Sequence, residues 1–405
     1  MVDGDTDRNG ESFRFEYDPG ILRYGRGCVN ALEDELAEHG IERALVVCGE
    51  TVGSTPAVVD PVTDGLGDRF AGVFAGTTPQ KRLATAFDAL DAMREHDADA
   101  LVALGGGSSL DVAKVAAVLA ATDRDAVGER FQGRGTITIP DTDLPPVVAV
   151  PTTLAGADLS IVAGITAHPE NGLVDDPASG GVGDPRLMPA AIAYDPELFA
   201  TTPKRILAGS AMNGFNKGLE TLYSRHATPV TDATAARGLG LLADGLVELG
   251  RGDVDADTLA PVVEGIVLVQ YGISRPDAGT LSVIHAFGHG LTHASDVQQG
   301  EAHAVVTPHV LEYLFEHVDG RRDRLADALG VDDDDTDPAG GIVDAVTDVV
   351  DALDLPTRLR DIDGPGPGAF EAIARYTLDD PFMANAPTGL DPTRDELERV
   401  LEAAY

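Results

Sequence analysis

The sequence has few cysteines and no long apolar run, and each shortage excludes a class of protein. Two cysteines among 405 residues cannot build a disulfide framework, which predicts a reducing, cytoplasmic location. No run of about 18 apolar residues exists, so we expect no membrane span. The opening residues, MVDGDTDRNGESF, contain no basic n-region and no apolar h-region, so we expect no secretory signal.

Positive charge is also scarce. The chain has 68 acidic residues against 29 basic ones, only four of which are lysines, and its formal net charge is −39. A surface this acidic repels nucleic acid and anionic membranes, so neither is expected as a partner. The acidic residues are spread along the whole chain rather than gathered in one tail. This distribution predicts adaptation to a salt-rich (halophilic) cytoplasm, where screening removes self-repulsion, and it makes each remaining lysine informative.

The chain is long and apolar enough for two domains with packed cores, since 43% of its 405 residues are hydrophobic. Its first half alternates apolar runs of strand length with helical stretches, which predicts a parallel sheet with helices on both faces. From about residue 200, Ala- and Leu-rich segments predict an all-helical half. We predict an acidic disordered tail at 1–12, an α/β domain at 13–198 and a helical C-terminal domain at 199–405.

The individual elements follow from the same patterns. Strands are predicted within 43–50, 99–104, 144–157 and 191–198, and a helix at 110–121. The Gly-, Asp- and Pro-rich stretch 168–183 is predicted to be a loop, as is 331–341. The helices of the second half are predicted at 205–224, 230–249, 257–274, 279–295, 302–318, 322–329, 340–354, 367–377 and 393–404.

The segment GGGSSLDVAK (105–114) places three glycines between a predicted strand and a predicted helix. Glycine lets the backbone approach a phosphate closely, and the free N–H groups at a helix start bind it. Neither G-x-G-x-x-G nor a Walker motif is present, so an ordinary strand-to-helix turn is the alternative. The longer S-x-x-D-x-A-K spacing favours a phosphate-binding turn.

Four segments together resemble the iron-containing (group III) alcohol dehydrogenase superfamily. They are GGGSSLDVAK (105–114), PTTLAGADLS (151–160), YDPEL (194–198) and HAFGHGLTH (285–293). The resemblance covers nearly the whole chain and implies a dehydroquinate synthase-like architecture, with an α/β dinucleotide-binding domain and an all-α C-terminal domain. It also implies NAD or NADP, a small-molecule substrate, and a homodimer or larger homo-oligomer. The residues that it places at the cofactor are Gly105, Gly106, Gly107, Ser108, Asp111, Thr152, Thr153 and Leu154.

The metal positions of the superfamily are altered in this chain. Members that bind a divalent metal use an Asp, a His four residues later, the first His of an HxxxH pair and a His fourteen residues beyond it. The resemblance places these positions at Asn213, Lys217, His285 and Gln299. Amide oxygens are weak ligands and an ammonium repels a cation, so only His285 is a credible ligand and we expect no divalent metal in the usual site.

A rival metal site on the helix of His285, His289 and His293 is the alternative. Residues eight apart on a helix are about 12 Å apart, so one ion does not take all three. A pair four residues apart leaves a rearranged metal site open.

One branch of the superfamily is especially similar. Maleylacetate reductases carry a Met-Asn pair and an E-x-H-A-V-V-x-P-H segment, which resemble AMNGFNKGLETLYS (211–224) and GEAHAVVTPHVLEY (300–313) here. Those reductases generally keep the histidines that Lys217 and Gln299 replace. The substrate therefore does not follow from this resemblance.

Lys217 stands where the superfamily places a metal ligand. Hydride transfer to a carbonyl builds negative charge on oxygen, which a metal normally stabilises, and a fixed ammonium is an electrostatic substitute. Asn213, one helical turn earlier, is expected to bind the substrate or the ammonium. The alternative is an ordinary lysine that is solvated or paired with Glu220.

Histidines supply the remaining predicted chemistry. By resemblance His289 lies near the nicotinamide, and its unperturbed pKa near 6.5 suits a proton donor to the developing alkoxide. His285 is expected to hydrogen-bond the substrate. The alternative for His289 is a core histidine bonded to a neighbour.

Cofactor choice depends on the end of the strand VVCGE. NAD-dependent folds place an acid there to bind the ribose 2′-hydroxyl and repel a 2′-phosphate. Here Gly49 removes that acid and Glu50 follows it, so NAD and NADP both remain open.

The leading interpretation is a metal-independent NAD(P)-dependent oxidoreductase acting on a small carbonyl or oxo-acid. Sugar-phosphate cyclases and glycerol-1-phosphate dehydrogenases fit less well, because they use the metal ligands that are missing here. The alternatives are a catalytically lapsed dinucleotide-binding sensor or assembly protein, and a metal-dependent alcohol dehydrogenase with a site rearranged around His285.

Overall fold

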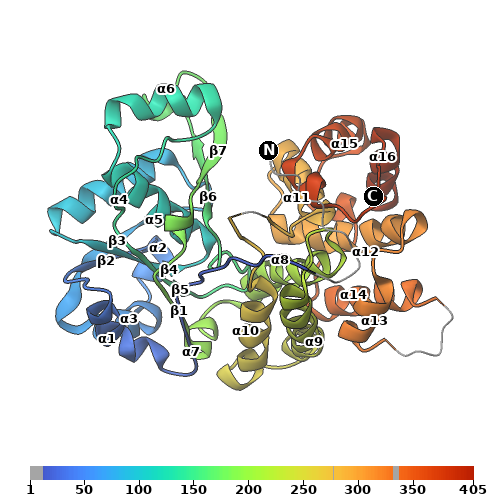
Figure 1. Cartoon of the computed structure of the whole chain (residues 1–405), viewed down its shortest axis with the longest axis horizontal. Helices are drawn as coiled ribbons and strands as arrows, with labels where there is room; N and C mark the ends of the chain where they lie inside the picture. The colour runs from blue at the N-terminus through green and yellow to red at the C-terminus, as the bar shows by residue number, and fades with distance from the viewer. Residues whose placement is uncertain (1–11, 277, 332–336) are drawn as a thin grey trace.

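The protein is represented by a computed structural model that describes residues 12–276, 278–331 and 337–405 (Figure 1). The predicted acidic tail lies outside the described residues, apart from residue 12. Within these ranges, no helix combines the length and the apolar character that crossing a membrane requires.

A six-stranded parallel sheet forms the first half of the molecule and confirms the predicted fold class. Its strands, in spatial order, are β1 (Ile21–Tyr24), β8 (Ala191–Tyr194), β5 (Val147–Pro151), β4 (Ala100–Gly105), β2 (Ala44–Gly49) and β3 (Phe70–Thr77). The chain adds β3 on one side of β2 and then β4 on the other. Gly49 and Gly105 therefore end neighbouring strands at a switch point, which is where open α/β sheets bind ligands.

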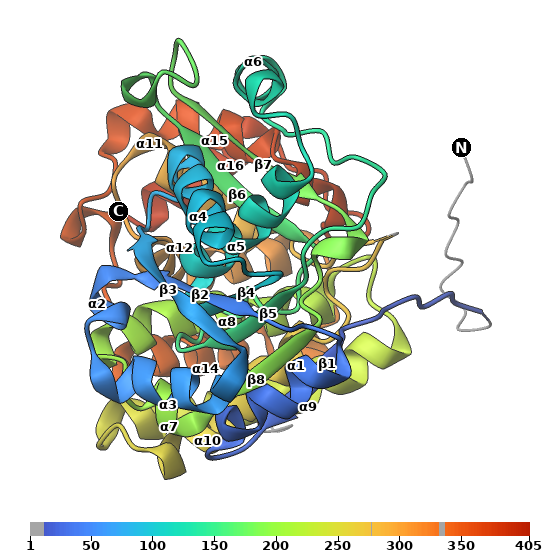
Figure 2. The same ribbon diagram turned by 90° about the vertical axis from the view of Figure 1, so that its left-hand side faces the viewer.

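Helices cover both faces of this sheet because successive residues of its central strands are buried on opposite sides. Leu45 and Val47 of β2 belong to the core formed with α4 (Leu83–Glu95) and α5 (Gly107–Ala120). Val46 and Cys48 belong to the core formed with α1 (Leu32–Glu38) and α3 (Pro56–Leu66). Figure 2 shows the two helix layers above and below the strands. The other α-helices of this half are α2 (Glu50–Gly53), α6 (Arg124–Arg134) and α7 (Pro196–Phe199).

The predicted loop at 168–183 is wrong for its last third. Residues Ala178–Gly183 form β7, which pairs antiparallel with β6 (Val162–Ala167). Gly180 lies against the backbone of Gly135, so closely that any side chain at 180 would overlap it. The glycines of this segment therefore permit a close approach within a strand rather than marking a loop.

The second half is helical, as predicted, and lies beside the sheet (Figure 1). Its helices are α8 (Lys204–Tyr223), α9 (Pro229–Arg251), α10 (Ala256–Gln270), α11 (Val283–Ala294), α12 (Gln299–His317), α13 (Arg322–Leu329), α14 (Ala339–Ala352), α15 (Phe370–Leu378) and α16 (Arg394–Ala403). Helix α8 packs against α9, α10, α11 and α12, which explains why its C-terminal part is buried on almost every side.

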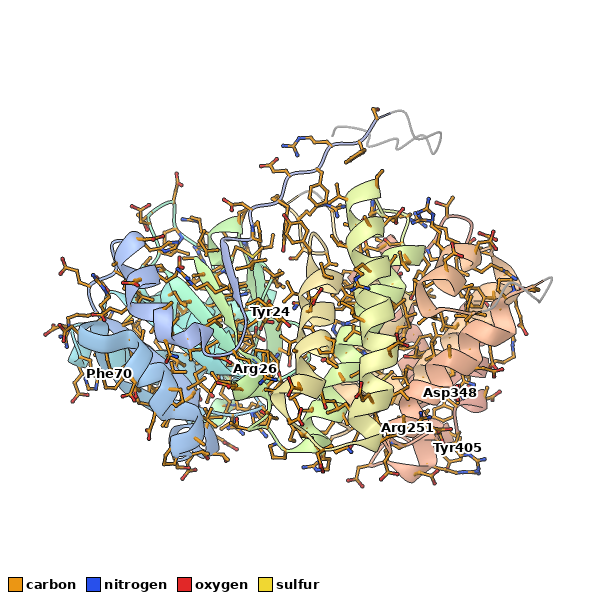
Figure 3. The ribbon with its side chains drawn as sticks, turned by 90° about the horizontal axis from the view of Figure 1, so that it is seen from below. Tyr24, Arg26, Phe70, Arg251, Asp348 and Tyr405 are labelled. Atoms are coloured by element: carbon orange, nitrogen blue, oxygen red, sulfur yellow. The ribbon has the colours of Figure 1, made fainter. Side chains whose placement is uncertain are left out.

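Contacts from the edge strand join the two halves. The Tyr24 hydroxyl donates to the Ala260 carbonyl of α10 at 2.8 Å, and Arg26 forms an ion pair with Asp257. Figure 3 shows both labelled side chains beside this helix. In the segment after β5, the Leu154 N–H donates to the Ser210 hydroxyl of α8 at 3.0 Å. The carboxyl ends of the strands therefore face the N-terminal part of α8.

Candidate active site

The glycine turn lies at the start of α5, and its geometry requires glycine. Gly105 has φ +126°, a conformation that other residues rarely adopt. Gly106 is the N-cap and supplies no capping side chain, so the first N–H groups of the 14-residue helix remain for a ligand. A Cβ added at Gly106 would lie 3.2 Å from Thr153 Cγ2. Helix and turn together form a site suited to a phosphate group.

Two charged residues of α5 tie this helix to its neighbours. Asp111 accepts a 2.7 Å bond from Lys81, and the Lys114 ammonium, fully buried, donates to the Ser160 carbonyl at 2.5 Å. Burial lowers the pKa of Lys114 to about 8. The S-x-x-D-x-A-K spacing thus holds α5 between the loop after β3 and the segment before β6.

The other predicted cofactor residues surround the same turn. The Thr152 N–H donates to the Gly105 carbonyl at 3.0 Å, which keeps the segment of Thr152, Thr153 and Leu154 beside the glycines. Gly49 caps α2, and a Cβ there would lie 3.2 Å from the Thr77 carbonyl oxygen. These residues fit a dinucleotide, with its pyrophosphate at α5 and a ribose at the end of β2.

Three of the four altered metal positions are in contact. His285 Nε2 lies 3.0 Å from Asn213 Oδ1, and Asn213 Nδ2 lies 3.4 Å from Gln299 Oε1. His285 comes from α11, Asn213 from α8 and Gln299 from the first turn of α12. The structure therefore brings together side chains that are up to 86 residues apart in the sequence.

Lys217 lies one turn further along α8 and is neither solvated nor hydrogen-bonded to Glu220. Its ammonium donates to the Gly156 carbonyl, and the residue is only 7% exposed. Glu220 instead accepts the His285 backbone N–H at 3.0 Å and lies 2.5 Å from His285 Nδ1. Burial lowers the pKa of Lys217 to about 8, opposed mainly by the Asp158 carboxylate.

His289 is held by an acid that sequence analysis missed. Its Nδ1 lies 2.8 Å from Asp380 Oδ2, and its ring packs on Phe382 with centroids 5.1 Å apart. Asp380 starts a short 3₁₀ helix (Pro381–Asn385) and also accepts the Phe382 N–H. The Asp-Pro pair is a sign of a helix start, but nothing local relates it to a histidine 91 residues earlier.

The remaining histidines do not complete a metal site. His293 stacks on Tyr376 with centroids 4.4 Å apart. His303 is fully buried, edge-on to His285 at 4.7 Å, and burial holds its pKa well below the usual value. Over the described ranges, no three His, Cys, Asp or Glu side chains are arranged to hold a metal ion.

The chemistry of the side chains at the four altered positions also argues against a divalent metal. Two neutral amides and one ammonium replace the usual acid and two of the histidines, and the imidazole that is kept, His285, is hydrogen-bonded to Asn213. A divalent metal does not fit this set, because the ammonium would repel it and the amides would bind it only weakly.

A dinucleotide turn at the sheet edge and histidines on the helical half define an NAD(P)-dependent oxidoreductase. The model of the family described as iron-containing alcohol dehydrogenase matches residues 19–196, and that of its C-terminal domain matches 207–405. The chain belongs to the iron-containing alcohol dehydrogenase family.

Maleylacetate reductases are among the relatives of this chain, as the predicted branch requires. Maleylacetate reductase 1 of Cupriavidus pinatubonensis is 27% identical over 396 residues, which cover 98% of each chain. Lactaldehyde reductase of Escherichia coli is 26% identical over 388 residues, 94% of this chain and 95% of the relative. The predicted likeness to maleylacetate reductases is thereby confirmed, alongside a likeness to aldehyde reductases.

Solved structures support the fold. A putative alcohol dehydrogenase from Ralstonia eutropha superposes with a TM-score of 0.80 at 27% identity, over 98% of both chains. A 1,3-propanediol oxidoreductase superposes with a TM-score of 0.86 at 22% identity, over 97% of this chain and 100% of its own. The second likeness concerns the fold alone.

Proposed function

We propose that this protein transfers hydride between NAD(P) and a small carbonyl or oxo-acid compound without a divalent metal, with Lys217 as the electrostatic substitute. The observation that supports this most directly is the burial of the Lys217 ammonium on α8, one turn after Asn213. A chain with four lysines keeps two of them, Lys114 and Lys217, at positions where a cation is costly to bury, and Lys217 is the one on the helix of Asn213.

Lys217 has the donors that the proposed role requires. An ammonium carries three N–H groups, and Gly156 accepts from one of them. Among the described residues this ammonium has no second hydrogen-bond acceptor, which leaves N–H groups for an oxygen on which negative charge develops. In a site shielded from water, such a fixed donor stabilises an oxyanion far more than it does in bulk solvent.

The proposed reduction is balanced by one hydride and one proton. When bound, the reduced nicotinamide supplies a hydride to the carbonyl carbon, and the C=O π electrons move to the oxygen. Lys217 and the Asn213 amide hold that oxygen as its charge grows. His289 gives its Nε2 proton to the alkoxide, while Asp380 on Nδ1 fixes the orientation of the ring.

Substitution of Lys217 tests the proposal. Lys217→Met should lower kcat for carbonyl reduction by about 100-fold, the cost of removing one oxyanion donor, and leave NADH binding unchanged. Lys204→Met is the matched control, because Lys204 lies on the same helix and donates to the Gly250 carbonyl at 2.7 Å, away from the site. Undiminished turnover in Lys217→Met would rule out the proposed role.

Metal analysis tests the metal-independent part. Protein purified in high salt should carry no stoichiometric divalent metal, and chelation should leave NADH and NADPH binding and turnover unchanged. A stoichiometric metal lost together with activity would favour the rearranged site around His285, where the ring of the buried His303 has no hydrogen-bond partner in the described structure. Cofactor binding without turnover of any aldehyde, ketone or oxo-acid would favour the sensor.

The proposal extends to assembly. We propose a homodimer or larger homo-oligomer, with a small molecule as substrate and neither nucleic acid nor membrane as a partner. Light scattering coupled to size exclusion, in molar salt, measures the oligomer directly.

A further inference from the structure

A third buried charge, Asp158, lies near the two buried lysines. Lys114 is 0% exposed, Asp158 6% and Lys217 7%. Burying an ionised group is costly unless opposite charge and hydrogen bonds compensate it. The proposed reaction gives Asp158 no role, so the burial of its carboxyl group needs a separate explanation.

Both lysines hold the segment that contains Asp158. From the helical half, Lys217 donates to the carbonyl of Gly156. From the α/β half, Lys114 donates to the carbonyls of Ser160 at 2.5 Å and Val162 at 3.4 Å. Asp158 is in the middle of this segment, so its carboxylate and the two ammonium groups are fixed by one short stretch of backbone.

The carboxylate is placed where the two halves meet. Asp158 Oδ2 accepts from the Tyr194 hydroxyl at the end of β8 and from Gln270 Nε2 at the end of α10, each at 3.4 Å. Gln270 also packs on Gly156, where an added Cβ would lie 2.7 Å from Gln270 Cδ. Burial raises the pKa of Asp158, and these neutral donors together with the charges of Lys217 and Lys114 oppose that effect by favouring the carboxylate.

The other acids near Lys217 are engaged elsewhere. Glu220, on α8 itself, binds His285, and Asp111, on α5, binds Lys81. The cationic neighbours are Lys114 on α5 and, if protonated, His303 on α12. Asp158 is thus the acid with the largest electrostatic effect on Lys217.

We infer that Asp158 is a positioning residue for the proposed reaction: its carboxylate is the counter-ion that Lys217 shares with Lys114, and it keeps Lys217 cationic beside Asn213. This inference rests on the role proposed for Lys217. It adds that the charge of Lys217 depends on two residues of the α/β half that the reaction mechanism does not include.

Removal of the Asp158 charge and removal of the Lys114 charge should shift the pKa of Lys217 in opposite directions. Asp158 raises the pKa of Lys217, so Asp158→Asn should lower the pH at which Lys217 loses its proton. Lys114 lowers the pKa of Lys217, so Lys114→Met should raise that pH. General loosening of the segment would move both variants in the same direction.

The scarcity of lysine makes this measurable without an activity assay. Selective 13C labelling at lysine Cε gives four signals from four lysines, and Lys217→Met identifies one of them. We expect the midpoint of the Lys217 signal to fall by about one pH unit in Asp158→Asn. We expect it to rise in Lys114→Met and to lie between these values in the double variant. Asp158→Glu, which keeps the charge, should retain a midpoint near that of the native protein.

Activity supplies the second measurement. Reduction requires the ammonium, so kcat should fall as pH rises through about 8, and this alkaline limb should move with the NMR midpoint in each variant. An unmoved Lys217 midpoint in either Asp158→Asn or Lys114→Met would overturn the inference, so one folded variant suffices. Full turnover in Lys217→Met, together with a displaced Lys217 midpoint in Asp158→Asn and Lys114→Met, would instead reject the proposed function and retain the shared counter-ion.

Discussion

Each of the four lysines has a specific acceptor, which is uncommon for a residue that usually extends into water. Lys81 binds a carboxylate, whereas Lys114, Lys204 and Lys217 donate to backbone carbonyls. A compact ammonium on a flexible stem can reach such carbonyls, whereas the planar guanidinium of Arg needs more space. Lysine thus remains in this acidic chain at positions where it supports the backbone or the site.

Asp380 provides a prediction at the scale of one residue. Asp380→Asn removes the carboxylate that orients His289, and we take as a guide the loss of about 10–100-fold that follows removal of carboxylates that orient metal-bound histidines. We expect kcat to fall by that factor with KM little changed, because His289 acts on the transition state. His293→Asn, one turn further along α11 and stacked on Tyr376, is the control and should retain nearly full activity. Equal losses in both variants would show that Asp380 acts only on the local fold.

At the scale of elements, strong patterns in the sequence predict part of the secondary structure. The helices α8 and α11 and the strand-turn-helix around Gly105 carry clear periodicity or a glycine signal, and all are present. Strand β3 was not predicted, because FAGVFAGT is a partly exposed edge strand that mixes Gly and Ala with apolar residues. Helix α5 begins at Gly107 rather than 110, since glycines and serines also serve as first-turn residues.

In the candidate site, too, only the residues that belong to local sequence patterns could be predicted. Asn213, Lys217 and His285 are found through the family resemblance, because each lies in a recognisable segment. Asp380 lies outside these segments, and Asp158 lies inside PTTLAGADLS (151–160) without a role there that the resemblance implies, since the roles of both depend on tertiary contacts. His289 and Asp380 are 91 residues apart, and Gln270 and Asp158 are 112 apart. No local pattern encodes such pairs.

The β2–α2 connection is the place where we expect cofactor preference to be determined. Gly49 leaves no carboxylate at the N-cap of α2, and Glu50 is the exposed first residue of that helix. Glu50→Gln should raise the NADPH-to-NADH ratio of kcat/KM by about fivefold, since one exposed charge interaction is worth up to about 1 kcal/mol. Glu42→Gln, exposed beyond the opposite end of β2, should leave the ratio unchanged. An unchanged ratio in Glu50→Gln would place the discriminating group elsewhere.

At the scale of the whole molecule, hydrogen bonds and ion pairs at several places join the two halves. Strand β1 reaches α10 through Tyr24 and Arg26, and the segment after β5 reaches α8 through Leu154 and Gly156. The second of these connections links the glycine turn, through Thr152, to the Lys217 ammonium. One continuous stretch of backbone therefore positions both the predicted cofactor site and the proposed oxyanion site.

The net charge of −39 predicts how the folded state responds to salt. Mutual repulsion between acidic side chains is stronger in the compact chain than in the unfolded one, and the Debye length shrinks from about 10 Å at 0.1 M salt to about 3 Å at 1 M. We expect Tm to rise steadily with KCl over this range. Sucrose at matched water activity is the control, because it favours compact states without screening charge, and it should not reproduce the full increase. A Tm independent of KCl would mean that the acidic surface serves a purpose other than function in high salt.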